Sequence, residues 1–430
     1  MPKLLNALLT SDMVALKKNL TAGHGCLEVD YMRREAMNRQ KNILVILLLC
    51  FVLELSSCAS DKASISETRN AASTASQSST WSNGDYVKQE TGNVKIDASV
   101  IAPDLTEAPV ILAEPFIVDK KTAESLLFQN EEVLNRTDAN NVYVLEGSNG
   151  SFLNIVESNN FMGNGFLGFG TSFSTCINNV FSWQKNVIIN NTKEFSTETD
   201  LAFASQKSAI AKVEETLRQL GVKNLGAFTV YSLDNKTLKS EEEKIKTNPD
   251  YSAAIASGKM SFKDSWSEDD DCYFMFIECH LQGIPVTTDE VYFSKDDESL
   301  SGNLITVIYS KRGIEYLQFM NLYQEKSTEQ MAQIITLDAA IAALTDKFAS
   351  IITANNYVVS KIQLVYVPTL MGQTNKEFRM IPAWCFTTNE YGVLDQDKSA
   401  ETDMNAKDET KELLTTYNIL ISAVDGKEII

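Results

Sequence analysis

Residues 357–367 read YVVSKIQLVYV, a run of β-branched and aromatic residues that predicts a strand. Two further extended runs follow, FRMIPAWCFTT at 378–388 and YNILISAVDGKEII at 417–430, and the last contains an Asp-Gly turn. In front of them, Thr336 can cap an amphipathic helix that begins at Leu337. This order of elements predicts an antiparallel sheet with a helix packed on one face.

A similar order comes earlier in the chain. An apolar stripe predicts a helix over 199–220, and Gly221 is well placed as its C-terminal stop. The strands LGAFTVYSL at 225–233 and CYFMFIECHLQGIPV at 272–286 follow. The repeat is one of pattern and not of residue identity.

The repeated pattern predicts an α+β protein with two tandem units, each an antiparallel sheet packed by a helix. We expect an N-terminal domain over residues 94–320 and a C-terminal domain over 321–430. Within the first domain the sequence also predicts a helix over 120–134, a hairpin that turns at 148–150, and a charged, solvent-facing helix over 236–248.

The N-terminal region contains NRQKNILVILLLCFVLELSSCASD at 38–61. Its apolar run, Ile43–Leu55, is shorter than the roughly 20 residues that a membrane-spanning helix needs, and it contains Glu54. Arg39 and Lys41 precede it, and small polar residues follow it. This layout is typical of a secretory signal peptide.

The end of this segment resembles the lipobox of bacterial lipoproteins, in which an apolar residue and two small residues precede a cysteine that becomes acylated. The residues that match are Leu55, Ser56, Ser57 and Cys58. The resemblance implies a signal peptide over 37–57, lipid attachment at Cys58, and a chain held at the extracytoplasmic face of the cell membrane. A core helix that happens to end in cysteine is the alternative, but the run has no polar face.

The residues on either side of the signal also have an interpretation. Residues 1–36 have no clear relation to the signal, and we expect an upstream extension that is not translated, with Met37 as the start. Residues 58–93 form the predicted tether, since 59–85 is rich in Ser, Ala and Thr and has almost no aliphatic residues.

The charge of the exported chain limits its partners. Residues 58–430 contain 31 Lys and Arg against 52 Asp and Glu, a net charge of −21. A chain this acidic is repelled by polyphosphate and by anionic lipid headgroups. We therefore expect no binding to nucleic acid, and an association with the membrane that depends on the acyl anchor.

Four cysteines remain after Cys58: Cys176, Cys272, Cys279 and Cys385. Cys272 and Cys279 lie in one predicted strand, about 23 Å apart at 3.3 Å per residue and on opposite faces. They therefore cannot pair with each other. We expect mostly buried thiols, although two disulfides remain an alternative for an exported protein.

Three of the quoted runs carry a resemblance to known families. IPAWCF at 381–386 and ILISAVDGKEII at 419–430 look like the ending shared by PepSY-type modules and by YycI/YycH-type regulators of Gram-positive bacteria, and CYFMFIECHLQGIPV resembles the matching strand and turn of an earlier module. The layout is also similar to clostridial lipoproteins without an assigned function. Since those regulators are held by a transmembrane helix, a lipid anchor here would be a departure, and it places a shared kinase partner in doubt.

The run MGNGFLGFG contains a formal G-x-G-x-x-G match at Gly163, Gly165 and Gly168. The dinucleotide fingerprint works only between a strand and a helix, and the following TSFSTCI at 171–177 alternates like a strand. We therefore expect no nucleotide site, and instead a glycine-rich hairpin. Its phenylalanines, Phe161, Phe166 and Phe169, could form a contact patch.

No catalytic or metal-binding motif stands out. His280 follows Cys279 in a predicted strand, where neighbours point to opposite faces, so the two do not form a Cys–His pair. The acidic runs at 268–271 and 296–298 lack the alternating ligands and the glycine of a calcium loop, and we expect solvated loops. We therefore expect no metal, cofactor or catalytic residue, although a pair of carboxylates cannot be recognised from sequence.

These observations favour a non-enzymatic lipoprotein that contacts and modulates a membrane or envelope protein, with exposed sheet edges suited to strand addition. Two alternatives remain open. One is a lipoprotein that binds a small molecule or peptide for a transporter, and the other is an envelope hydrolase that uses a carboxylate pair.

Overall fold

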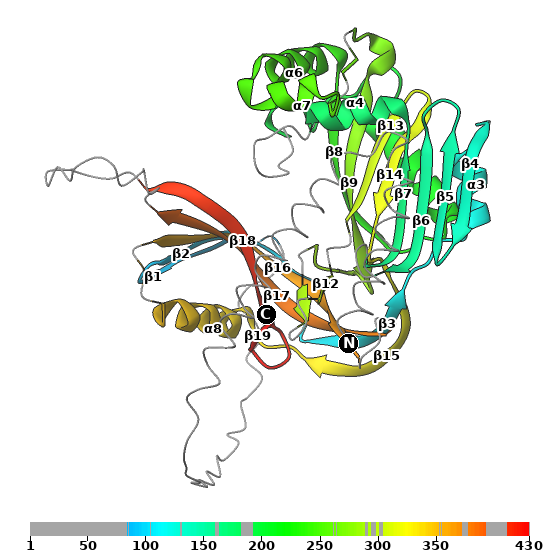
Figure 1. The fold of residues 1–430 in the computed structure, drawn as a ribbon. Coiled ribbons are helices and arrows are strands. Elements are labelled where there is room, and N and C mark those ends of the chain that lie inside the picture. Colours follow the sequence, from blue (N-terminus) through cyan, green and yellow to red (C-terminus); the bar gives the residue numbers. More distant parts are fainter. Residues whose placement is uncertain are drawn as a thin grey trace, which may run out of the picture. The chain divides into compact units, whose positions relative to one another are not determined.

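The computed structural model describes residues 84, 86–103, 105–129, 131–159, 163–181, 192–260, 262–263, 265–288, 291–293, 298–300, 304–351, 353, 355–371, 377–392 and 411–429. The upstream extension, the signal peptide, most of the tether and the residues Leu55, Ser56, Ser57 and Cys58 lie outside these ranges. Within them the fold is α+β, with mostly strands and with six α-helices, α3 to α8 (Figure 1). None of the described helices is long and apolar enough to cross a membrane.

The described residues fall into two compact units. The smaller one contributes residues 248–261, which hold a 3-10 turn at Pro249–Tyr251 and the short helix α7 at Ser252–Ala256. All other described elements belong to the larger unit, which contains two large sheets.

The first sheet has the strand order β1-β2-β16-β17-β18-β19, and β3 and β15 extend it beside the start of β17. Its strands are β1 (Tyr86–Thr91), β2 (Val94–Ile101), β3 (Glu107–Pro115), β15 (Tyr323–Gln333), β16 (Asn356–Leu370), β17 (Phe378–Gly392), β18 (Glu412–Ser422) and β19 (Glu428–Ile429). All neighbours are antiparallel except β2 and β16, which are parallel. The sheet is therefore mixed, and it joins strands from both sides of the boundary at residue 320 that the sequence predicted.

Helix α8 (Leu337–Ala349) packs on this sheet. The Thr336 side chain accepts a hydrogen bond from the Ala339 N–H at 3.2 Å, which confirms the predicted cap. The buried helix face shares a core with strand residues such as Ile96, Ile362 and Phe386. The residues of that helix face are Leu337, Ala340, Ile341, Leu344 and Phe348. Helical spacing extends the predicted stripe to Ile351, but this residue lies beyond the helix and is 39% exposed.

The second sheet is antiparallel, with the order β10-β9-β13-β14-β7-β6-β5-β4 and with β8 also paired to β9. Its strands are β4 (Val133–Ala139), β5 (Val142–Gly147), β6 (Phe152–Asn159), β7 (Gly163–Gly170), β8 (Leu225–Leu233), β9 (Cys272–Leu281), β10 (Ile284–Pro285), β13 (Ile305–Ser310) and β14 (Gly313–Phe319). A separate pair is formed by β11 (Val291–Phe293) and β12 (Glu298–Leu300).

Helices cover both faces of the second sheet. Strand β9 shows this, since its successive side chains point to opposite faces and contact different helices. Tyr273 and Met275 share a core with α3 (Lys120–Leu127) and α5 (Gln206–Gln219). Phe274 stacks on Phe181 of α4 (Ser172–Phe181), with 4.1 Å between the ring centroids. Helix α6 (Asn235–Thr247) contacts α4 on that second face.

Several local predictions need correction. Helix α5 begins at Gln206 rather than at residue 199, since Ser205 caps it, although Gly221 has a φ of +95° and ends it as predicted. Helix α3 ends at Leu127, and the last two residues of the predicted helix, Val133 and Leu134, begin strand β4, where cross-strand pairing prevails over local helical spacing. The strand predicted at 171–177 is helix α4, whose apolar face is buried against the sheet.

Helix α6 is not simply solvent-facing. Glu241 and Glu242 are each 1% exposed, and their carboxylates pair with Lys244 and Lys246 on the same helix. Lys244 Nζ lies 2.5 Å from Glu241, and Lys246 Nζ lies 2.7 Å from Glu242. The helical i,i+3 and i,i+4 spacings bring these charges together, which lets two carboxylates remain in a buried environment.

All four predicted thiols are free cysteines. Cys272, Cys279 and Cys385 are buried, and Cys176 is half-buried. Cys272 and Cys279 both lie in β9, at positions whose side chains point to opposite faces, as expected.

Candidate functional site

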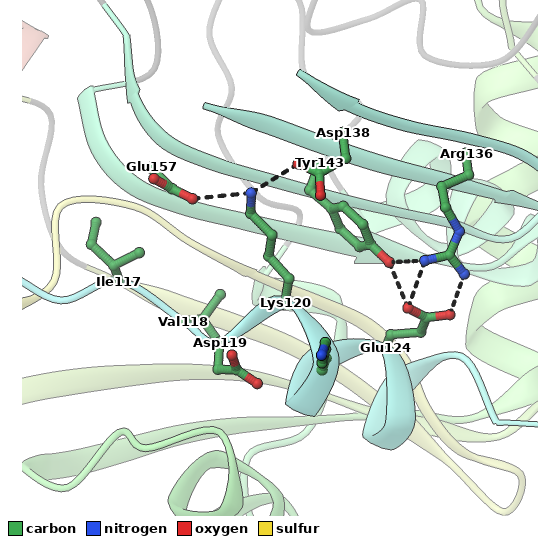
Figure 2. Close-up of a pocket in the computed structure, with 10 residues that line it drawn as sticks. Ile117, Val118, Asp119, Lys120, Glu124, Arg136, Asp138, Tyr143 and Glu157 are labelled. Carbon is green, nitrogen blue, oxygen red and sulfur yellow. Dashed lines mark hydrogen bonds and ion pairs between the residues drawn. The ribbon is translucent and has the colours of Figure 1, made fainter. Parts of the chain in front are cut away.

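A hollow lies where the start of α3 meets strands β4, β5 and β6 (Figure 2). Its volume is about 780 Å³. The residues that line it are Ile117, Val118, Asp119, Lys120, Lys121, Glu124, Arg136, Asp138, Tyr143 and Glu157. None of them was singled out from the sequence, since they come from a helix and three strands with no recognisable motif.

Local structure places these side chains. Asp119 caps α3 by accepting hydrogen bonds from the Thr122 N–H at 2.8 Å and the Thr122 hydroxyl at 2.7 Å, which lower the pKa of Asp119. The helix then presents Lys120 and Glu124 one turn apart on the side that faces the sheet.

The β4–β5 hairpin supplies the opposite wall. Asn140 and Asn141, with φ of 54° and 65°, connect the paired residues Ala139 and Val142, as in a two-residue hairpin turn with positive φ at both central positions. Arg136 and Asp138 are two residues apart on β4 and so lie on the same face, and Asp138 is directly opposite Tyr143 of β5.

One cluster joins Glu124, Arg136 and Tyr143. The Arg136 guanidinium donates to both carboxylate oxygens of Glu124, at 2.6 Å and 3.1 Å. The Tyr143 hydroxyl donates to Glu124 Oε2 at 2.5 Å, and it accepts from Arg136 Nη1 at 2.6 Å. Each of the three groups is therefore bonded to the other two (Figure 2).

A second cluster is centred on Lys120. Its ammonium lies 3.0 Å from Asp138 and 3.1 Å from Glu157, so it joins β4 to β6 across the intervening β5. The two carboxylates raise the pKa of Lys120 above its ordinary value. Lys121 also lines the hollow, and it is exposed.

The electrostatics favour an ionised Glu124 and a neutral Tyr143 at neutral pH. Burial, followed by the hydrogen bond to Glu124, raises the pKa of Tyr143 to about 12. The Arg136 and Tyr143 hydrogen bonds lower the pKa of Glu124 below its ordinary value of 4.5. A general acid or base works best with a pKa near the ambient pH, so these shifts oppose proton transfer by Glu124 and Tyr143.

A smaller hollow of about 90 Å³ lies beside His280, between β9 and strands of the first sheet, and Glu278, Val286, Lys361 and Cys385 help to line it. His280 Nε2 is 3.4 Å from Glu278 Oε2, and this contact lowers the pKa of Glu278. Burial raises the pKa of the neighbouring Cys279 thiol to about 12. A buried thiol on the opposite strand face supports the prediction that Cys279 and His280 form no catalytic pair.

The glycine-rich run is strand β7, paired with β6 and β14. Gly163, Gly165 and Gly168 lie within this strand, and helix α4 begins two residues after its end, at Ser172. A Cβ at Gly168 would come within 2.8 Å of the Phe166 ring, which explains a glycine there by packing. Phe166 and Phe169 are 5% and 4% exposed, so the predicted contact patch is wrong for both residues. Phe161 lies outside the described residues.

The acidic run at 268–271 is partly buried, contrary to the prediction of a solvated loop. Asp270 accepts a hydrogen bond from the Ser267 N–H at 2.9 Å, and Asp271 accepts one from the Asn235 N–H at 2.7 Å at the start of α6. These carboxylates therefore organise the chain around α6. Among the described residues no group of three or more His, Cys, Asp or Glu side chains could hold a metal ion, and residues 296 and 297 lie outside them.

No family model and no curated protein matches this chain. A solved structure that is similar is that of an uncharacterized protein from Eubacterium rectale, with a TM-score of 0.58 and 15% sequence identity. The match covers 80% of this chain and 92% of that one. At this identity the likeness shows a shared fold and gives no information on function.

Proposed function

We propose that the chain is a lipoprotein, anchored through Cys58 to the extracytoplasmic face of the cell membrane, that modulates a membrane or envelope protein by direct contact without catalysis. The lipobox-like residues Leu55, Ser56 and Ser57 support the anchor. In this proposal the two sheets with their packed helices are PepSY-like units, and the chain of the second sheet lies between strands of the first.

The observation that carries the non-catalytic part is the state of the ionisable groups in the hollow beside α3. Four of its ionisable groups, Lys120, Glu124, Arg136 and Tyr143, are tied to neighbours and held away from a neutral-pH titration. Such a network rigidifies α3 against the sheet. It gives less support to the hydrolase alternative, which needs one carboxyl group with a raised pKa.

In-cell crosslinking of the anchored protein, followed by mass spectrometry, tests this proposal. We expect one membrane or envelope protein to be enriched, and we expect the enrichment to disappear in a Cys58→Ala control that cannot be acylated. Recovery of abundant neighbours alone, at equal levels in both strains, would contradict the proposal.

The hollow itself favours one second candidate, a protein that binds a small molecule or peptide. Its 780 Å³ falls within the usual size range of ligand sites, and its wall combines both signs of charge with the Tyr143 ring and the half-exposed Ile117. This lining fits a zwitterion such as an amino acid or short peptide. Thermal-shift measurements with free amino acids and a dipeptide set test it, with Lys121→Ala and Lys223→Ala as site and control variants.

A further inference from the structure

The edge strands of the two sheets differ in how they are protected from pairing with another chain. Exposed edges commonly carry charges, bulges or short strands that block such pairing. Strand β4 has Arg136, Asp138 and a bulge, and β15 has two bulges and charged side chains along its length. Strand β1 carries Lys88 and Glu90, both exposed.

Strand β18 carries such protection only at its outer end, where Glu412 is charged and a register shift lies between Leu413 and Thr415. From Leu413 to Ser422 it reads LLTTYNILIS, with no charged residue, proline or glycine. Its neighbour β19 pairs only with Leu420 and Ile421. Within the described part of the chain, the outer edge from Leu413 to Tyr417 therefore has no strand partner, and Leu413 and Leu414 are 53% and 38% exposed.

The direction of the backbone groups on this edge follows from two hydrogen bonds. The Ala423 N–H donates to Pro382 O at 2.8 Å on the β17 side, and the Ser422 N–H donates to Lys427 O at 2.7 Å on the β19 side. Successive residues alternate between the two sides, and the pairing with β17 has no register shift between Thr415 and Ser422. Thr416, six residues before Ser422, thus directs its N–H and C=O outward.

We propose that this outer edge of β18 binds an extended segment of the partner protein by strand addition, and this proposal rests on the proposed function. An outward row of backbone donors and acceptors is matched by another extended backbone. A second copy of this chain would bring together two molecules of net charge −19, which repel each other. The partner segment is therefore neutral or basic, free of proline, and rich in β-branched or aromatic residues.

A matched pair of variants at Thr416 tests the edge. Thr416→Pro removes the outward N–H and adds a ring on the open side, while it leaves the hydrogen bonds to β17 in place. Thr416→Ala is the control, because both variants lose the 2.7 Å hydrogen bond from the Thr416 hydroxyl to Asn389. Leu413→Lys is a second test variant that leaves the backbone unchanged, and circular dichroism checks the fold of all three.

The probe is a displayed library of random decapeptides, selected on the purified full-length chain. We expect enriched peptides of the stated chemistry that bind wild type and Thr416→Ala alike, with about tenfold weaker binding to Thr416→Pro and to Leu413→Lys. Equal binding to Thr416→Pro, or no enriched peptides, would overturn strand addition at β18.

Two other occupants would also overturn the proposal. A concentration-dependent dimer that Thr416→Pro abolishes would assign the edge to a second copy. A Thr416 amide that exchanges slowly in the free monomer would assign it to another part of the same chain.

Photo-crosslinking in cells separates this inference from the proposed function. A photo-crosslinker at Leu413 and one at Leu134, which is 61% exposed on β4, are compared in cells. A partner captured at Leu413 and lost in Thr416→Pro supports both proposals. If a partner is captured from Leu134 but not from Leu413, strand addition at β18 is wrong and the proposed function stands. If no partner is captured in any experiment, the proposed function is wrong.

Discussion

Strands β4 and β18 both lie at the edges of large sheets, yet they carry opposite kinds of side chain. Along β4, Arg136 bonds to Glu124 of α3, and Asp138 bonds to Lys120. Along the outer half of β18, the side chains from Leu413 to Tyr417 are uncharged. The first edge is closed to another strand by charges that need water or ionic partners, and the second retains the properties of a strand ready to pair.

The ion-pair network beside β4 has two effects that β18 lacks among the described residues. The ion pairs around Arg136 fix α3 to its sheet, and they also place polar groups that would be desolvated if a foreign strand were added to β4. No comparable network lies along β18 among the described residues, so its open edge is where association is expected. Five predictions test this comparison, and those with the greatest expected change come first.

The two halves of β18 should differ most in stability. Ile421 is 2% exposed and packs in the core beneath α8, so Ile421→Ala should lower the free energy of unfolding by about 2–5 kcal/mol. Leu413→Ala, on the outer half of the same strand, should change it by less than about 0.5 kcal/mol. Urea unfolding followed by circular dichroism measures both, and equal losses would mean that the outer half is covered.

A pair of tyrosines compares the two regions next. Tyr143→Phe removes a hydroxyl that bonds to Glu124 and Arg136, and we expect a loss of about 1 kcal/mol in the free energy of unfolding. Tyr417→Phe, on β18, should cost less than about 0.5 kcal/mol, since no hydrogen bond of its hydroxyl is found among the described residues. A larger loss for Tyr417→Phe than for Tyr143→Phe would contradict the comparison.

Both tyrosines should titrate late, and a different carboxylate adds to the effect of burial at each one. Burial comes first for both, and each has a pKa of about 12, with Glu124 adding to the effect at Tyr143 and Glu390 at Tyr417. Glu124→Gln should therefore lower the pKa of Tyr143 and leave that of Tyr417 unchanged. Carbon-13 NMR of the tyrosine ring carbons between pH 9 and pH 13 resolves the two, and an equal response of both would refute the network.

The sign of the pH dependence follows from the same shifts. Because the folded pKa of Tyr143 lies above its ordinary value of 10, its stabilising contribution is complete below pH 10 and is lost as the pH rises through about 12. Because the folded pKa of Glu124 is lowered, its contribution is present above the ordinary value of 4.5 and is lost as the pH falls. Between pH 10 and pH 12, wild type should therefore lose more of its free energy of unfolding than Tyr143→Phe, and urea unfolding at each pH measures this.

The smallest effect concerns the exposed apolar residues of the two edges. Leu134→Lys on β4 and Leu413→Lys on β18 should each leave the melting temperature nearly unchanged, because both side chains are more than half exposed. Their effects on partner capture should differ, since only the β18 variant places a charge on an open edge. Differential scanning fluorimetry and in-cell crosslinking provide the two readouts, and a loss of capture for Leu134→Lys would assign the contact to β4.

Much of the fold is predictable where a strong local signal coincides with burial. The Thr336 cap, the stop at Gly221, the strands of residues 357–367 and 378–388 and the α+β class all follow from spacing and turn chemistry. The sequence prediction fails where the strand period of two residues and the helical period of 3.6 residues fit the apolar pattern equally well. Residues 171–177 alternate like a strand but also offer a helical apolar face, and the packing of Phe181 on Phe274 decides for the helix.

Composition and neighbours along the chain reveal the four cysteines that follow Cys58, the acidic charge, the signal-like segment and the presence of extended runs. The folded chain is needed to see that β2 lies parallel beside β16, that Glu124 meets Arg136 and Tyr143, and that β18 keeps an open edge. These features could not be predicted because strand order and ion pairing join residues far apart in the chain. Their energies depend on which surfaces are buried together, and a local pattern does not encode that choice.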